Sequence, residues 1–180
     1  GMRVLIDANV LFPTVLREIV LGLADTGYFE PLWSDRILEE WRRAAVRIGE
    51  GEVGEIEVAA ARRRFPDAGV QVSAATIAGI ALPDPDDDHV LAAAIDGAAD
   101  ELLTMNLRDF PTNALAAHGV IRRDPDGFLL EAYHAAPERM REVVETVLRQ
   151  AGAHGIDVSA PRRVLKRARL PRLGKALYAH

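Results

Sequence analysis

The chain has 180 residues, of which 49% are hydrophobic and 27% charged, a composition that is typical of a globular domain and excludes a mostly disordered chain. It has no cysteine, which excludes disulfides, thiolate nucleophiles and cysteine-based metal sites. It also lacks a membrane-length apolar run and a signal peptide, so we expect a cytoplasmic protein with no membrane partner. The formal net charge of −5 is uneven, because residues 161–180 carry seven Lys/Arg and no acid, which leaves −12 on the remainder.

Short apolar runs alternate with helical patterns along the chain, and this alternation predicts an α/β fold with a parallel sheet. Buried strands are predicted at residues 4–6, 70–72, 102–105 and 120–121. Helices are predicted at residues 13–25, 34–48, 56–65, 87–98, 126–134 and 138–151, with a glycine-rich loop at 49–54. Two short helical pieces should follow on either side of Pro171. The pattern places a domain boundary near Pro125, which gives a domain of residues 2–125 and a helical extension of residues 126–180.

A few acids occupy informative positions in this pattern. Asp7 follows the first strand, and ligands of parallel α/β sheets bind beyond the carboxyl ends of the strands. An aspartate that caps a turn or a helix is the alternative for this residue. In the helix 34–48, Glu40 lies at the edge of an apolar stripe that includes Trp41, where it either reaches a cleft or pairs with Arg36 or Arg43. The stripe is formed by Ile37, Leu38, Trp41, Ala44, Ala45 and Ile48.

Four aspartates occur within the five residues 84–88, and helix capping explains only one of them. On the helix that follows, the projection places Asp87 on the buried face, Asp88 at its flank and His89 away from it. A carboxylate that points toward a core is costly unless it is paired or binds a metal.

The strand near residues 102–105 also ends in polar groups, because Thr104, Asn106 and Asp109 precede a Phe-Pro stop. We therefore expect four acids from four segments to meet in one cleft: Asp7, Glu40, Asp87 and Asp109. Oxygen-only ligands without His or Cys favour Mg²⁺ or Mn²⁺ over zinc, and such a site suits metal-assisted hydrolysis of a phosphodiester.

Four segments, taken in this order, resemble the PIN-domain nucleases, and more narrowly the VapC-like toxin ribonucleases. They are VLIDANVLF (4–12), SDRILEEW (34–41), LPDPDDDHVLAAA (82–94) and LTMNLRDFP (103–111). The resemblance covers residues 2–125 and implies a three-layer α/β/α fold with acids at the carboxyl edge of a central parallel sheet. It also implies an Mg²⁺/Mn²⁺-dependent endoribonuclease, the toxin of a toxin–antitoxin pair, whose partners are RNA and an antitoxin protein.

The resemblance assigns roles to individual residues. Asp7 and Asp87 match metal ligands, and Glu40 matches the helix acid of the family. Many members have an aspartate where this chain has Asn106, whereas others use the later acid, here Asp109, so the fourth position stays open between these two residues. The side chains that would orient the ligands are Asn9, Thr104, Asn106 and Asp88.

Two other functions are alternatives for this sequence. A phosphotransferase with an aspartyl nucleophile needs a second acid two residues after Asp7, where this chain has Asn9. A degenerate PIN domain would bind RNA or a protein partner without cutting, but the four acids are all present. The basic tail is expected to contact RNA phosphates, the antitoxin or the chain's own acidic body, through residues that include Arg162, Arg163, Lys166 and Arg167. Leucines between these cations could dock on the body or on a second subunit, which would make a homodimer.

Overall fold

The computed structural model describes residues 1–179, and it divides into two compact units. The first unit comprises residues 1–12 and 29–123, and the second unit comprises residues 13–28 and 124–180. The helix predicted over residues 13–25 therefore packs with the C-terminal helices in one unit, although it lies between two strands of the other unit in the sequence.

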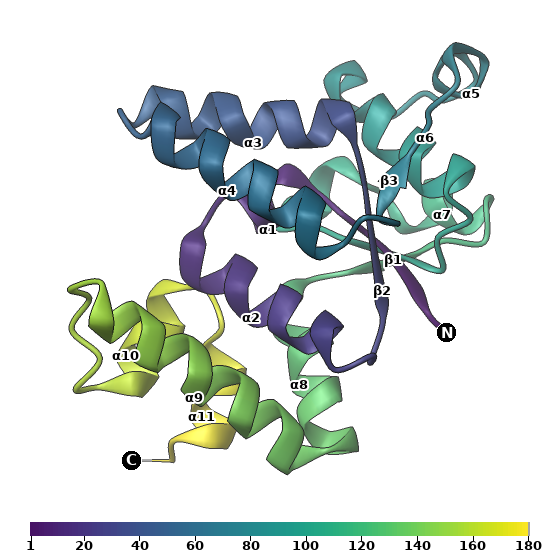
Figure 1. Cartoon of the computed structure of the whole chain (residues 1–180). Coiled ribbons are helices and arrows are strands. Elements are labelled where there is room, and N and C mark those ends of the chain that lie inside the picture. The colour runs from purple at the N-terminus through teal and green to yellow at the C-terminus, as the bar shows by residue number, and fades with distance from the viewer. Residues whose placement is uncertain (180) are drawn as a thin grey trace. The chain divides into compact units, whose positions relative to one another are not determined.

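The first unit contains a five-stranded parallel sheet with the strand order β3-β2-β1-β4-β5 (Figure 1). Its strands are β1 (Arg3–Ile6), β2 (Glu30–Ser34), β3 (Gly69–Val70), β4 (Glu101–Leu103) and β5 (Ile121–Arg123). Its helices are α1 (Ala8–Leu11), α3 (Asp35–Arg47), α4 (Gly51–Arg64), α5 (Ala74–Ala78), α6 (Asp88–Asp96) and α7 (Thr112–Ala116), and two single 3₁₀ turns are η1 (Pro85–Asp87) and η2 (Leu107–Asp109).

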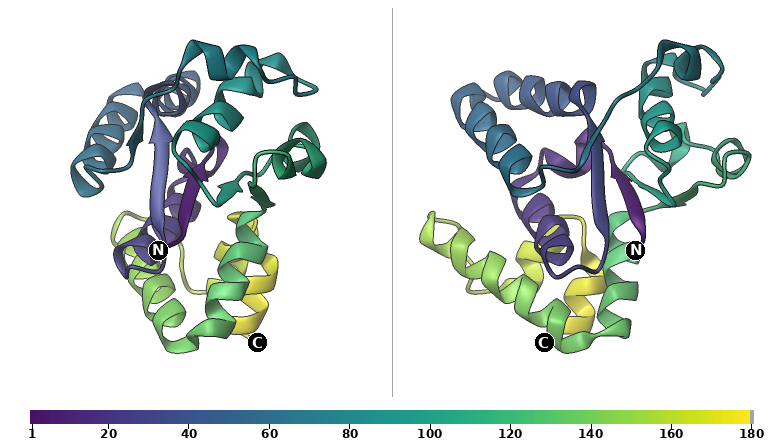
Figure 2. Two further views of the ribbon diagram at one scale, coloured as in Figure 1. Left: turned by 90° about the vertical axis from the view of Figure 1, so that its right-hand side faces the viewer. Right: turned by 45° about the vertical axis from the view of Figure 1, so that its right-hand side comes forward.

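Helices cover both faces of this sheet. Figure 2 shows the strands of the first unit between the α3–α4 pair and α6, which packs against β1, β2 and β4. The three-layer α/β/α arrangement predicted for the chain is therefore confirmed. β1 lies at the centre, and Val4, Leu5 and Ile6 are completely buried because both faces of the strand are covered.

One strand of the sheet was not predicted. β2 begins with Glu30 and Pro31, residues that argue against a strand, yet it pairs with β1 on one side and β3 on the other. Residues 30–34 form a strand despite these two residues because the strand buries Leu32 and Trp33, which are each 2% exposed.

The helix limits also differ from the predictions at several points. Ser34 caps α3 as predicted, with its Oγ accepting a hydrogen bond from the Ile37 amide, but Ile48 lies beyond the helix and is 58% exposed. The predicted loop at 49–54 ends early, because α4 already begins at Gly51. The helix predicted to reach Ala98 ends at Asp96, and Ala98 adopts a positive φ of 51° after the Gly97 cap. The short helices α1, α5 and α7 were not predicted.

The second unit is helical throughout the part that the structure describes. It consists of α2 (Thr14–Asp25), α8 (Pro125–Ala135), α9 (Pro137–Ala153), α10 (Pro161–Arg167) and α11 (Pro171–Leu177). The two short pieces of the basic tail thus lie on either side of the break at Pro171, as predicted. Their apolar residues are buried within this unit: Val164, Leu165, Leu170, Leu173 and Leu177. The leucines therefore form part of the hydrophobic core of the second unit.

Within residues 1–179, no helix combines the length and the apolar character needed to cross a membrane.

Candidate metal centre

Asp7 is positioned by the pairing of two central strands. Ile6 lies opposite Leu103 in the parallel ladder of β1 and β4, and the Asp7 amide continues the ladder by donating to the Leu103 carbonyl at 3.0 Å. Asp7 and Thr104 therefore leave their strands side by side, at the carboxyl edge of the sheet. The Thr104 hydroxyl donates to Asp7 Oδ2 at 2.9 Å, and the Ala8 amide donates to Oδ1 at 2.8 Å. Asp7 also caps α1, so this residue has the capping role that was the alternative to a role in a binding site, and it lies at the carboxyl edge as well.

Polar side chains hold the Asp7 carboxylate in place. The Asn9 amide nitrogen lies 3.3 Å from both Asp7 Oδ2 and Thr104 Oγ1, while the Asn9 carbonyl accepts from the Met105 amide at 3.0 Å. Burial raises the pKa of Asp7, and the nearby Glu40 carboxylate raises it further. The hydrogen bonds from Thr104 and Ala8 oppose this shift by stabilising the charged form.

Three carboxylates gather at the turns that precede α6 and follow β4. Asp84, Asp87 and Asp109 each offer an oxygen, and these oxygens lie within 4.8 Å of one another. Asp84 was not among the predicted ligands, although it belongs to the run of acids that capping could not explain. Its side chain also caps η1, because Oδ1 accepts from the Asp86 amide at 2.9 Å.

Asp87 has the most perturbed environment of the three. Its Oδ2 is buried and has no hydrogen-bond partner among the described residues. Burial, followed by the charges of Asp7, Asp84 and Asp109, raises the pKa of Asp87 from 3.8 to about 7. An unpaired, buried carboxylate oxygen among other carboxylates is the environment that a bound cation would relieve.

Asn106 and Asp109, the two candidates for the fourth position, contact each other. The Asn106 side chain donates to Asp109 Oδ2 at 2.6 Å, and its backbone amide donates to Thr104 Oγ1 at 3.0 Å. Asp109 thus contributes an oxygen to the three-carboxylate cluster, and Asn106 lies beside it as a hydrogen-bond donor.

Glu40 approaches the same region from α3. It lies near enough to Asp7 to raise the pKa of that carboxyl, and its Oε1 lies 2.8 Å from His89 Nε2. The prediction that His89 points away from the buried face was wrong, because its side chain is only 2% exposed. α6 is buried on more than one side, and one of these sides carries His89, which lies against Glu40 of α3. Asp88 does not join the cluster but accepts a hydrogen bond from the Leu82 amide at 3.1 Å.

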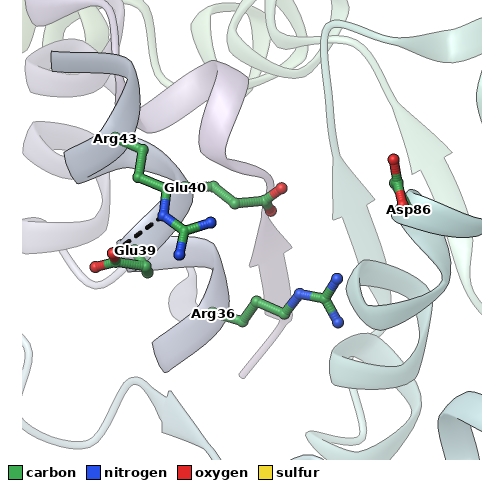
Figure 3. A pocket seen from close by; sticks show the side chains of 5 residues that line it. All are labelled: Arg36, Glu39, Glu40, Arg43 and Asp86. Atoms are coloured by element: carbon green, nitrogen blue, oxygen red, sulfur yellow. Dashed lines mark hydrogen bonds and ion pairs between the residues drawn. The ribbon is translucent and has the colours of Figure 1, made fainter. Parts of the chain in front are cut away.

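A pocket of about 490 Å³ opens beside these acids. Figure 3 shows the Arg36 and Glu40 side chains extending from α3 toward the segment that carries Asp86. The lining residues are Arg36, Glu39, Glu40, Arg43 and Asp86.

The predicted RNA-binding cations lie in the second unit. Arg162, Arg163 and Lys166 line a separate pocket of about 500 Å³, and Lys166 and Arg167 are exposed in the last turn of α10. Arg172 of the same tail is already engaged, since its backbone amide and side chain both donate to Asp126. Part of the basic tail therefore pairs with acids of its own unit.

A parallel α/β sheet with carboxylates gathered at its carboxyl edge defines a protein with an acidic, oxygen-rich candidate metal site. The family model of the PIN domain matches residues 3–108, more than half of the chain, and the chain therefore belongs to the PIN domain family. Among curated proteins, it is similar to "Putative ribonuclease VapC50" of Mycobacterium tuberculosis, with 38% identity over 58 residues. That match covers 32% of this chain and only 34% of the relative. No solved structure gives a significant match.

Proposed function

We propose that this protein is an Mg²⁺- or Mn²⁺-dependent endoribonuclease of the PIN family and the toxin of a toxin–antitoxin pair. The observation that carries the proposal is the cluster of Asp84, Asp87 and Asp109, in which one buried oxygen of Asp87 has no partner among the described residues. Membership of the PIN domain family and the similarity to a protein named as a ribonuclease support the choice of reaction.

The donor set fits a hard divalent cation. Every candidate ligand is a carboxylate oxygen, which suits Mg²⁺ or Mn²⁺ better than zinc. Asp84, Asp87 and Asp109 would hold the cation, and Asp7 and Glu40 lie close enough to add their charge. When bound, the cation would supply Lewis-acid chemistry for the hydrolysis of a phosphodiester.

The other polar side chains would keep this site in shape. Thr104 and Asn9 fix the orientation of Asp7, and Asn106 fixes that of Asp109. The buried His89 ring lies 2.8 Å from Glu40 Oε1 and would limit the movement of this side chain. We assign positioning roles to these four residues, because none of them adds a carboxylate to the cluster.

RNA binding requires cations as well, because the acids repel phosphates. Arg162, Arg163, Lys166 and Arg167 remain the candidates in the second unit, where they surround or adjoin a pocket. A degenerate PIN domain that binds without cutting is the less favoured alternative, since Asp7, Glu40 and the three clustered aspartates are all present.

Cleavage of a mixed single-stranded RNA pool tests the enzymatic part of the proposal. We expect cuts with Mg²⁺ or Mn²⁺, none with EDTA, and a loss of at least a hundredfold in Asp87→Asn and Asp109→Asn, the scale on which catalytic electrostatics acts. Asp67→Asn is the matched control, because Asp67 is exposed and precedes β3 at the opposite edge of the sheet. Cleavage that persists in EDTA, or equally in Asp87→Asn, would contradict the proposal.

Expression in a bacterial host tests the toxin part. Wild-type protein should arrest growth, Asp87→Asn should not, and co-expression of a small DNA-binding protein encoded next to the gene should restore growth. Normal growth with active, soluble enzyme present would argue against a toxin while leaving the nuclease proposal intact.

A further inference from the structure

The pocket beside the acids has a size that suits one nucleotide. Its volume of about 490 Å³ lies within the range of roughly 300–1,000 Å³ that is usual for small-ligand pockets. Glu40 lines the pocket, and its charge also raises the pKa of Asp7. Asp86 lines the other side and is adjacent in sequence to Asp87 of the carboxylate cluster. The pocket therefore adjoins the acids of the proposed metal site.

Most charges that line this pocket already have partners. Glu39 accepts from Arg42 at 2.6 and 2.8 Å and from Arg43 at 3.2 Å, and the Arg42 hydrogen bonds contribute most to lowering the pKa of Glu39 to about 2. Glu40 contacts His89. The exceptions are Arg36 and Asp86, whose exposed side chains make no hydrogen bond or ion pair with any described residue.

Arg36 also occupies a position that helix stability does not favour. It is the second residue of α3, after the Ser34 cap and Asp35, where the positive end of the helix dipole disfavours a cation. Helix stability therefore does not explain this unpaired arginine, which extends into a pocket that Glu40 and Asp86 also line.

We propose that this pocket binds the nucleotide that flanks the cleaved phosphodiester of single-stranded RNA, and that Arg36 binds its phosphate. The inference rests on the proposed nuclease function and adds a substrate subsite to it. A guanidinium binds phosphate through two parallel hydrogen bonds, and its charge offsets the repulsion between RNA and the neighbouring carboxylates. An antitoxin segment would be the other occupant, but the position of the pocket beside the acid cluster favours the substrate.

Binding of a labelled 20-nucleotide single-stranded RNA pool tests the subsite. Fluorescence anisotropy is measured on the full chain in the Asp87→Asn background, with and without Arg36→Ala, over a range of salt concentrations. We expect Arg36→Ala to raise the dissociation constant by at least about tenfold, since even one lost charge-assisted hydrogen bond has this effect. The slope of log K against log salt should fall by about 0.7, the contribution of one phosphate contact on a single strand.

Two further variants sharpen the experiment. Arg36→Lys should retain part of the affinity and the whole salt slope, because it keeps the charge but loses the two-pronged geometry. Arg63→Ala is the matched control, since Arg63 is an exposed cation in the last turn of α4. In otherwise wild-type enzyme, Arg36→Ala should raise KM more than it lowers kcat, as expected for a residue that binds the substrate away from the reacting bond.

The outcomes separate the inference from the function on which it rests. If wild-type enzyme cleaves RNA and Arg36→Ala behaves like Arg63→Ala in affinity and salt slope, the subsite is wrong. The same holds if Arg36→Ala keeps its RNA affinity but loses affinity for the protein encoded beside its gene, because the pocket would then bind that protein. If wild-type enzyme neither binds nor cleaves RNA, the proposed function itself fails.

Discussion

Replacing Asp87 with asparagine should stabilise the metal-free protein. The folded-state pKa of Asp87, about 7, lies above its ordinary value of 3.8, so ionisation of this carboxyl disfavours folding. The folded state favours the protonated form of Asp87, so the stabilisation from this proton is complete below about pH 4 and is lost as the pH rises through 7. Asparagine cannot ionise, so the variant avoids this loss.

The expected gain follows from the size of the pKa shift. A shift of this size corresponds to at most about 4 kcal/mol, since one pKa unit is worth about 1.4 kcal/mol. Asp87 is only partly buried, and solvent screening reduces the gain to about 1–2 kcal/mol above pH 7.5. The melting midpoint should therefore rise by about 5 °C at pH 8, and by much less at pH 4.5.

Tryptophan fluorescence reports on the relevant part of the chain. Both tryptophans of the protein, Trp33 and Trp41, are buried in the first unit, so urea and thermal unfolding in EDTA follow the unit that contains Asp87. Asp86→Asn is the control, because it removes one exposed charge from the same turn. A gain that is equal at pH 4.5 and pH 8, or a loss of stability in Asp87→Asn, would refute the electrostatic reasoning.

Three other perturbations have expected outcomes. In wild-type protein, Mn²⁺ at a hundred times its dissociation constant should add about 2.7 kcal/mol of stability, measured by thermal unfolding, and Asp109→Asn should show less at the same concentration. Thr104→Val should cost about 1–3 kcal/mol in urea unfolding and reduce cleavage, because it removes a buried donor to Asp7. Replacing three exposed cations by glutamine should lower the salt slope of RNA binding by about 2 in anisotropy titrations, while cleavage at saturating RNA persists. These cations are Arg163, Lys166 and Arg167.

The parts of the site that sequence could predict lie next to strong local signals. Asp7 follows the apolar run of residues 4–6, and Thr104 follows the apolar pair Leu102 and Leu103, so the two strand ends were identifiable without a structure. The rule that parallel strands share a carboxyl edge then brings these residues together. The hydrogen bond between Thr104 and Asp7 is the physical result.

Other features depend on tertiary packing, which local patterns do not encode. His89 was misplaced because the helical projection assumes one buried face, whereas Ala92 and Ala93 are also fully buried and α6 is covered on several sides. β2 was missed because Glu30 and Pro31 disfavour a strand, although in the fold this segment pairs with β1 on one side and β3 on the other. In both cases burial overrides local preference.

Asp84 shows a different limit. A helical projection cannot place a residue in the turn before a helix, and Asp84 precedes η1. The sequence indicated that four acids in five residues exceed the needs of capping. It did not indicate which of them faces Asp109, because that depends on how η1 and η2 approach each other in the fold.

Burial raises the pKa of both Asp7 and Asp87, but the two carboxyls differ in their hydrogen-bond partners. Asp7 receives donors at both oxygens, so its carboxylate has partners that favour the charged form in spite of burial. Asp87 receives none at its buried Oδ2 and retains a proton up to about pH 7. A cation that binds Asp87 must therefore displace this proton, so metal affinity rises with pH and levels off above about 7. The site thus combines a hydrogen-bonded carboxylate at Asp7 with a carboxyl at Asp87 that becomes charged below pH 7 only when a cation displaces its proton.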